Sequence, residues 1–314
     1  MSRVRAAHTA LAIAAALLVS ACDPQSPFGL PLKASNGRCG QTGVFARDRQ
    51  QVLQCKAGRY RKLMSLQRAS QLIAEYQRGQ SVPSQSLGVL LVGDSFATSL
   101  FPGIQAVREV DPSVTPHNAA VIGCGIGRGG WSRGTGVEQP LATACTKRDE
   151  GIQFMIRERS PRVAVVAGGL WDVTDRRLDG DEAWRAIGDP IYDNYLISEA
   201  LHLIDLLSSA GLSVVWTTSP HWEPSYVPAL LMGPPPYAEA DPARADRYNE
   251  IIRAAVAQRP AVLLVDLAAF MQTLPGGEFA PTLRTDGVHL NPEGSRRVAE
   301  WLLPHLKNAA SPAG

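Results

Sequence analysis

The sequence has little excess charge and only one long apolar run, and each shortage excludes a class of protein. Its 314 residues include 31 basic and 29 acidic ones, a net charge of +2, with no basic cluster, so we expect no nucleic-acid partner. Beyond residue 21 no stretch approaches the ~20 apolar residues that a transmembrane helix needs. The chain also lacks a phosphate-binding loop, a dinucleotide glycine pattern and clustered metal ligands, so we predict neither a cofactor nor a metal.

The N-terminus resembles a bacterial lipoprotein signal. Arg3 and Arg5 precede the apolar run TALAIAAALLV, and small residues then lead to Cys22. This pattern predicts a signal peptide over residues 1–21 and a lipid on Cys22, which would anchor an extracytoplasmic protein to a membrane. The alternative is an ordinary secretory signal with an incidental cysteine.

The remaining four cysteines would then lie in an oxidising compartment, where disulfides form. Three pairings of Cys39, Cys55, Cys124 and Cys145 are open. Proximity in the sequence favours Cys39 with Cys55 and Cys124 with Cys145, because short loops are the easiest to close. A zinc site is the alternative, but the chain has no CxxC pair with ligand spacing.

Composition divides the rest of the chain into four parts. A stretch rich in Pro, Ser and Gly predicts a tether, and the segments GVFAR and QVLQC predict a small cysteine-paired hairpin module. A linker then leads to a large domain. The predicted boundaries are 22–36 for the tether, 37–66 for the module, 67–86 for the linker and 87–308 for the large domain.

Short apolar runs alternate with segments of helical period throughout the large domain. Runs of this kind are typical of strands buried on both faces, and the alternation predicts an α/β fold with a parallel sheet of about five strands between two layers of helices. The predicted strands are 88–93, 118–123, 162–169, 212–219 and 261–266, and the predicted helices are 96–110, 144–159, 195–211, 244–259 and 291–306. Ligands of such sheets bind at the carboxyl ends of the strands.

Ser95 lies where the first strand of the large domain becomes a helix, in the segment LLVGDSFATSL. The unpaired N–H groups and positive dipole of a helix start stabilise negative charge, so a serine there suits a nucleophile whose own N–H helps to bind an oxyanion. Serine is also a favoured N-cap, and that is the structural alternative.

Asp286 and His289 lie three residues apart just before the last predicted helix, in LRTDGVHLNPEG. A tight turn of this length can place a carboxylate beside one imidazole nitrogen while the other faces a nucleophile. Together with Ser95, the pair predicts an esterase-like triad, in which His289 is the base and Asp286 its orienting group.

These motifs resemble the SGNH (GDSL-type) family of esterases and acyltransferases over about residues 87–308. The resemblance implies a three-layer, flavodoxin-like α/β/α fold and an oxyanion hole that includes the backbone N–H groups of Ser95 and Gly123. Gly125 is a nearby alternative to Gly123, and it could instead line the cleft. Asp172 and His221 are further candidates for the cleft. Asp172, at a strand end, could instead shape the oxyanion turn, and His221 could equally be an ordinary loop residue.

One motif of this chain departs from the family. Where the family usually has Gly-x-Asn-Asp, this chain has Gly169-Leu170-Trp171-Asp172. The indole N–H of Trp171 could replace the missing amide donor of the oxyanion hole, or the ring could form an apolar wall of the acyl pocket. Loss of one such donor slows hydrolysis by roughly 3 kcal/mol in barrier height. A weakened hydrolase is compatible with a transferase.

The finer resemblance is to the extracytoplasmic SGNH domains fused to type-3 membrane acyltransferases. It implies a serine enzyme that removes or transfers O-acyl, commonly O-acetyl, groups on cell-envelope glycans or other small esters, with an envelope acyltransferase as a partner. The alternative is a catalytically silent glycan-binding or scaffold lipoprotein.

Overall fold

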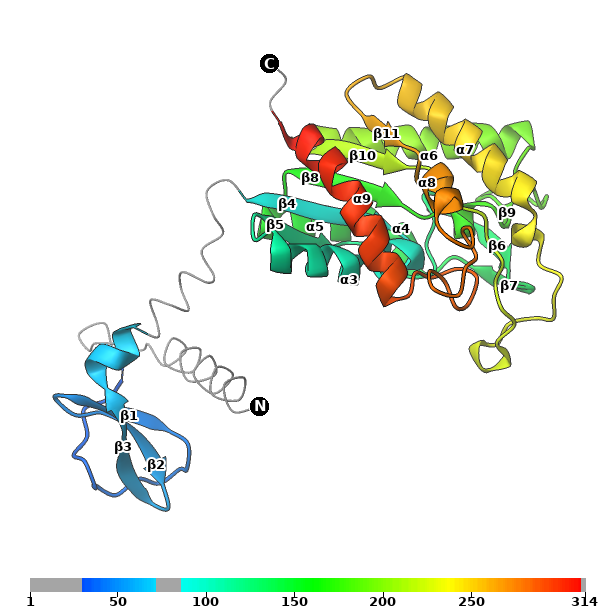
Figure 1. Cartoon of the computed structure of the whole chain (residues 1–314). Coiled ribbons are helices and arrows are strands. Elements are labelled where there is room, and N and C mark those ends of the chain that lie inside the picture. The colour runs from blue at the N-terminus through cyan, green and yellow to red at the C-terminus, as the bar shows by residue number, and fades with distance from the viewer. Residues whose placement is uncertain (1–29, 72–85, 312–314) are drawn as a thin grey trace. The chain divides into compact units, whose positions relative to one another are not determined.

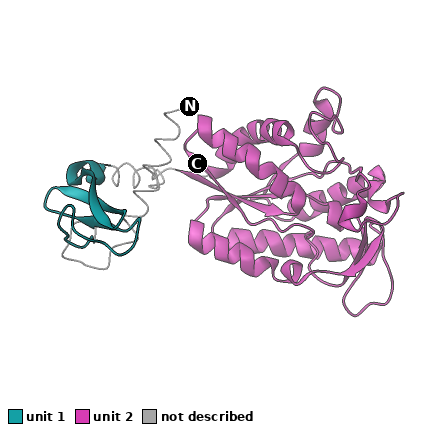
Figure 2. Ribbon diagram, turned by 90° about the horizontal axis from the view of Figure 1, so that it is seen from below, with its two compact units in different colours: residues 1–84 teal, residues 85–314 magenta. Residues whose placement is uncertain are grey.

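The computed structural model describes residues 30–71 and 86–311. The chain forms two compact units, Met1–Ser84 and Gln85–Gly314 (Figure 2), each with its own core. The predicted signal peptide, Cys22 and parts of the predicted tether and linker lie outside the described residues. Within the described ranges no helix combines the length and apolar character needed to span a bilayer.

The smaller unit is a three-stranded antiparallel sheet. Its strands β1 (Phe45–Arg47), β2 (Gln51–Lys56) and β3 (Arg59–Ser65) pair in the order β1-β2-β3. The first two form the predicted hairpin, and a disulfide joins Cys39 to Cys55 as predicted. The third strand was not predicted, because its sequence RYRKLMS is mostly polar and only Tyr60 is buried.

The larger unit is built on a five-stranded parallel sheet (Figure 1). Its strands, in the spatial order β11-β10-β8-β4-β5, have the flavodoxin-like arrangement in which the first strand lies between the second and the third. This confirms the predicted fold class. The strands are β4 (Leu87–Gly93), β5 (Val114–Asn118), β8 (Val163–Ala167), β10 (Ser213–Thr217) and β11 (Leu263–Val265).

The second strand of this sheet was placed wrongly by the sequence. The prediction was residues 118–123, whereas β5 covers Val114–Asn118. Because β5 is at the edge of the sheet and half-buried, its sequence VTPHN lacks an apolar run. The apolar residues after it form a loop that still donates from Ala119 and Val121 to the carbonyls of Leu91 and Gly93 in β4.

Helices cover both faces of the parallel sheet (Figure 2). Helix α3 packs against α9, the last helix, whereas α6 packs against α7. The helix α9 begins as predicted, since the Asn291 side chain accepts the N–H of Gly294 and Pro292 lies in the first turn. The helices are α3 (Ser95–Val110), α4 (Thr143–Thr146), α5 (Arg148–Arg159), α6 (Pro190–Ser209), α7 (Pro242–Ala257), α8 (Leu267–Thr273) and α9 (Pro292–Ala310).

A second, smaller sheet was not predicted at all. It contains β6 (Trp131–Gly134), β7 (Val137–Pro140) and β9 (Asp175–Arg177) in the order β7-β6-β9, all antiparallel. Two of its strands lie between β5 and α4 in the sequence, and the third comes after β8. The unit also contains the short 3-10 turns η2 (Leu170–Asp172), η3 (Pro228–Leu230) and η4 (Ala238–Ala240).

The contact between α3 and α9 depends on Gly103. Its N–H donates to the hydroxyl of Ser295 at 2.7 Å, and that hydroxyl donates to the carbonyl of Leu100. A Cβ on Gly103 would lie 2.0 Å from the backbone oxygen of Ser295. The two helix backbones therefore approach too closely for any side chain at this position.

We predict that Gly103→Ala lowers the stability of the larger unit by about 2 kcal/mol, in the range of overpacked core substitutions, and that its Tm falls by roughly 4–8 °C. The matched control is Gly151→Ala in α5, where a Cβ meets nothing within 4 Å. That variant should gain about 0.5–1 kcal/mol from the higher helix propensity of alanine. The measurement is the Tm of both variants in thermal unfolding, and an unchanged Tm for Gly103→Ala would contradict the close approach of the two helices.

Candidate active site

The candidate site lies at the carboxyl ends of β4 and β8. The chain leaves β4 toward the edge strand β5 on one side, and β8 lies on its other side. In open α/β sheets, ligands bind at such a switch point. Ser95 is the first residue of α3, which follows the turn after β4. The segment with Trp171 follows β8 and forms η2.

The structure brings together the three residues predicted to form the triad. His289 Nε2 lies 2.8 Å from Ser95 Oγ, and His289 Nδ1 lies 2.6 Å from Asp286 Oδ2. The other carboxylate oxygen of Asp286 accepts the N–H groups of Val288 and His289. The imidazole is thus held between a hydroxyl from the start of the domain's sequence and a carboxylate from near its end.

The electrostatics of this array favour a charged imidazole. The hydrogen bond that His289 donates to Asp286 raises the pKa of His289 above its ordinary value, and the Asp94 carboxylate adds to the effect. Burial opposes ionisation of Asp286, but its hydrogen bonds with His289 and Val288 outweigh burial and lower the pKa of Asp286 to about 2. Asp286 is therefore ionised at neutral pH and stabilises a protonated His289.

Asp94, and not Ser95, caps helix α3. Its Oδ1 accepts the N–H of Phe96 at 2.9 Å, and its Oδ2 accepts the N–H of Gly169 at 3.1 Å. Asp94 is 1% exposed, and burial raises its pKa to about 6. Because the cap is supplied by its neighbour, the hydroxyl of Ser95 remains for His289. The Gly169 N–H, in turn, is taken by Asp94 and cannot serve a ligand.

The loop after β5 presents Gly123 and buries Gly125. Gly123 lies in a turn with φ +82°, it is half-buried, and its N–H donates to no other described residue. A Cβ on Gly125 would instead lie 2.2 Å from the Asp172 carboxylate. Of the two predicted alternatives, Gly123 therefore has the accessible N–H. Gly125 is a buried part of the same loop, packed against the Asp172 side chain, and does not line an open cleft.

Asp172 supports this loop from below. It is fully buried, and its two carboxylate oxygens accept the N–H groups of Ile126 and Gly127. The loop is further held by Arg148, whose guanidinium donates to the carbonyls of Gly125 and Ile126. Both oxygens of Asp172 are therefore used inside the protein, which agrees with the predicted alternative that Asp172 shapes this turn and not with a place in an open cleft.

The ring of Trp171 is partly buried against the core of the larger unit and lies close to Gly134 of β6. A Cβ on Gly134 of β6 would lie 3.1 Å from the indole ring. The indole Nε1 is buried and has no hydrogen-bond partner in the described part of the chain. This arrangement favours the apolar-wall alternative, since an inaccessible N–H cannot meet a ligand without a movement of the ring.

His221 lies between two carboxylates. Its Nδ1 lies 2.7 Å from Glu278 and its Nε2 lies 3.1 Å from Asp246. Burial alone would lower the pKa of His221, but these two carboxylates raise it. Both ring nitrogens of His221 thus have carboxylate partners, and its place in the cleft stays a prediction.

Arg284, which the sequence analysis missed, braces the loop of the triad. It is buried, and its guanidinium donates to the carbonyls of His221 and Glu278 and to the Glu278 carboxylate. The loop after Arg284 carries Asp286, whose carbonyl accepts the N–H of Ser225. No sequence pattern identifies such a brace, since its partners are three segments that meet only in the fold.

The predicted second disulfide is present next to Gly123. Cys124 bonds to Cys145, and the loop is thereby joined to the short helix α4. Both predicted pairings are thus confirmed.

Comparison with known proteins gives a family match over most of the chain. The profile described as "SGNH domain (fused to AT3 domains)" matches residues 65–304. No protein with a curated description matches the chain.

Three solved structures illustrate the similarity. A GDSL-like lipase from Bacteroides thetaiotaomicron is 15% identical, with 75% of this chain and 97% of that chain covered and a TM-score of 0.44. The periplasmic domain of a lipopolysaccharide acetyltransferase from Salmonella Paratyphi A is 13% identical, with 74% and 87% covered and a TM-score of 0.45. An acetyl xylan esterase is 16% identical, with 69% and 98% covered and a TM-score of 0.44.

We predict that the imidazole of His289 titrates above the ordinary histidine value of about 6.5, so that the neutral form is lost as the pH falls through that raised pKa. Asp286→Asn removes the hydrogen-bonded carboxylate and should move the midpoint downward. NMR titration of the ring protons measures this, with His117 as the internal control, because burial lowers its pKa. A midpoint for His289 below that of His117 would contradict the geometry.

Proposed function

The chain belongs to the SGNH family, and from this membership and the geometry of Ser95, His289 and Asp286 we propose that it is a serine acyl-ester enzyme. The observation that carries the proposal is the position of His289, with one ring nitrogen 2.8 Å from a serine hydroxyl and the other 2.6 Å from a carboxylate. Serine needs a base of this kind before it can attack an ester.

In the first half-reaction Ser95 Oγ attacks the carbonyl carbon of the ester, while His289 Nε2 takes the hydroxyl proton. The tetrahedral intermediate then collapses, the bond to the leaving alkoxide breaks, and His289 returns the proton to that oxygen. The products are a free alcohol and an acyl group on Ser95. Asp286 remains ionised throughout and stabilises the imidazolium.

In the second half-reaction a hydroxyl compound attacks acyl-Ser95 and transfers its proton to His289. Collapse of this intermediate frees Ser95 Oγ, which recovers the proton, and the acyl group leaves on the attacking oxygen. Water as the attacker makes the enzyme an esterase. A glycan hydroxyl makes it an O-acyltransferase, and both outcomes use the same residues.

The backbone N–H groups of Ser95 and Gly123 are our proposed donors to the oxyanion. The N–H of Ser95 lies at the start of a 16-residue helix, where the dipole favours negative charge. The loop of Gly123 is bonded to β4 through Val121 N–H and Gly93 O, just before the Ser95 turn. With Trp171 Nε1 enclosed, these two donors would do the work of the family's usual three.

We propose acylated glycan of the cell envelope as the substrate and a lipid anchor at Cys22 as the attachment to a membrane. The two disulfides support an extracytoplasmic location, because such bonds persist in oxidising compartments. The family description, which names a fusion to AT3 domains, supports an envelope acyltransferase as a partner. The acetyltransferase and acetyl esterase among the similar structures act on lipopolysaccharide and xylan respectively.

The competing hypothesis is a silent glycan-binding lipoprotein. Glycan binding alone does not require a histidine that contacts a serine hydroxyl with one ring nitrogen and an ionised carboxylate with the other. The hydrogen bonds that hold Asp286 in place, from Val288 and His289, are also intact. The enzyme is therefore the better account of the geometry.

We predict that Ser95→Ala abolishes turnover of p-nitrophenyl acetate, at least a 10³-fold loss, while Tm stays within about 1 °C because Asp94 supplies the helix cap. Mass spectrometry of rapidly quenched wild-type protein should find an acetyl group on the peptide that contains Ser95. The control is Ser198→Ala on an exposed position of α6, which should turn over at the wild-type rate. Wild-type turnover by Ser95→Ala would refute the mechanism.

We also predict that the disulfide beside Gly123 matters for turnover. The double variant Cys124→Ala/Cys145→Ala frees the loop from α4, and a donor displaced by about 1 Å can lower kcat by tenfold to a hundredfold. The matched control is Cys39→Ala/Cys55→Ala, which removes a disulfide from the other unit. Steady-state kinetics should find a lower kcat only in the first variant, and an equal kcat in both would exclude a positioning role for the bond.

A further inference from the structure

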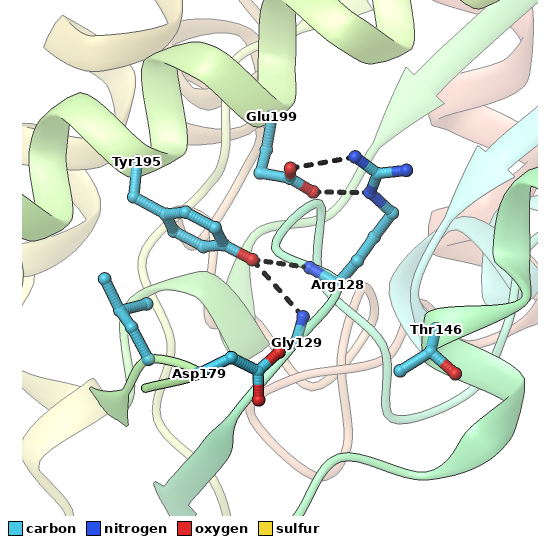
Figure 3. Close-up of a pocket in the computed structure, with 7 residues that line it drawn as sticks. Arg128, Gly129, Thr146, Asp179, Tyr195 and Glu199 are labelled. Carbon is cyan, nitrogen blue, oxygen red and sulfur yellow. Dashed lines mark hydrogen bonds and ion pairs between the residues drawn. The ribbon is translucent and has the colours of Figure 1, made fainter. Parts of the chain in front are cut away.

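A polar pocket of about 430 Å³ lies outside the triad (Figure 3). Four segments meet there: Tyr195 and Glu199 project from α6, Arg128 and Gly129 belong to the loop before β6, Asp179 comes after β9, and Thr146 ends α4. Its volume is within the range of sites for small ligands. The lining residues are Arg128, Gly129, Thr146, Leu178, Asp179, Tyr195 and Glu199.

Two side chains of this pocket have hydrogen-bond donors without a partner among the described residues. The Tyr195 oxygen accepts the N–H groups of Arg128 and Gly129 at 2.9 and 3.3 Å, and its own O–H donates to no described residue. The Arg128 guanidinium donates to Glu199 twice and to Asp149 once. Since a guanidinium has five N–H groups, two remain, on a side chain that is 30% exposed and held in one orientation.

The same pocket offers acceptors. The Asp179 side chain is exposed and has no hydrogen bond or ion pair with any other described residue, and its carboxylate lies against Gly129. The Thr146 hydroxyl donates to the carbonyl of Thr143 at 2.9 Å, which leaves its lone pairs free. Leu178 adds an apolar contact.

The side chains that line the pocket itself, apart from the Arg177 guanidinium at the Trp131 ring, carry net negative charge. Among the described residues that line the pocket, Arg128 is the single cation, and Glu199 and Asp179 are both carboxylates. A phosphate or a uronic acid would therefore meet net negative charge at short range. Donors and acceptors that alternate over an uncharged ligand instead suit vicinal hydroxyl groups, each of which donates and accepts.

An exposed aromatic side chain, Trp131, follows the pocket-lining Gly129 closely in the chain. Trp131 begins β6 two residues after Gly129, pairs with Arg177 of β9, and is 39% exposed. The Arg177 guanidinium lies 4.8 Å from the Trp131 ring and 5.5 Å from that of Trp184, so one cation–π contact orients the Trp131 indole. An exposed, oriented indole presents a flat apolar face to the C–H groups of a pyranose ring.

We propose that this pocket, together with Trp131, is a subsite for a neutral sugar unit of a glycan. The identification of a glycan rests on the proposed function. Gly129 is six residues from Gly123 in the sequence, and six residues of extended chain span at most ~20 Å. A glycan whose ester lies at Ser95 thus needs only a few further units to reach the subsite.

The test is calorimetric titration of the wild-type protein with three unacylated neutral hexasaccharides, cellohexaose, xylohexaose and chitohexaose, and with the anionic hexagalacturonate. We expect saturable binding of at least one neutral sugar and weaker binding of hexagalacturonate. Asp179→Ala should weaken the neutral complex by tenfold or more, as for a lost hydrogen bond to a charged group. Trp131→Ala should weaken it roughly fivefold through lost apolar contact.

Matched controls separate the subsite from general effects. Glu182→Gln removes another exposed carboxylate of the segment after β9, and Phe154→Ala removes an exposed ring on α5. Both should bind the sugar as the wild type does. Equal weakening in the control variants, no binding of any neutral hexasaccharide, or equal affinity for hexagalacturonate would each overturn the subsite.

The result is distinguishable from failure of the proposed function. Turnover of p-nitrophenyl acetate without glycan binding would refute the subsite and leave the esterase mechanism intact. Sugar binding that depends on Asp179, in a protein without turnover, would refute the enzyme and support the subsite.

Discussion

The buried carboxylate of Asp94 is the contact on which the rest of the site depends. It ties the turn after β4 to the turn after β8 by accepting the N–H groups of Phe96 and Gly169. The two turns lie at the switch point of the sheet, where the chain leaves space for a ligand. Because Asp94 takes over the helix cap and joins the turns, Ser95 can keep its hydroxyl free at a helix start and still lie on a rigid support.

The other half of the array is held by a loop, and its rigidity comes from outside that loop. His289 precedes the last helix, and Leu290 N–H donates to the hydroxyl of Ser99 on α3. Arg284 fixes the same segment to the carbonyl of His221 from the opposite side. Two hydrogen bonds, from Leu290 to Ser99 and from Arg284 to His221, therefore fix the position of the His289 loop. Ser99 belongs to α3, the helix that begins with Ser95.

Features that depend on local pattern could be predicted from the sequence, whereas features that depend on distant segments could not. Buried strands such as β8 and β10 show as apolar runs, and the Asp286–His289 spacing is a local turn, so these features were predictable. The edge strand β5 was not, because exposure on one side removes its apolar run. The partners of Asp172 and His221 could not be predicted for a related reason: Ile126 and Glu278 lie 46 and 57 residues away.

The substitution of Trp171 for the family's usual asparagine connects the acyl site with the second sheet. Its ring packs against Gly134 at one end of β6, and Trp131 lies at the other end of the same strand. An asparagine in this position would supply an amide donor but too little surface to fill the space beneath β6. The indole instead packs against the strand on which the proposed sugar-binding surface is built, while backbone N–H groups are the proposed donors to the oxyanion. In this chain the side chain at this position therefore packs against the second sheet, where the family's usual residue offers an amide donor.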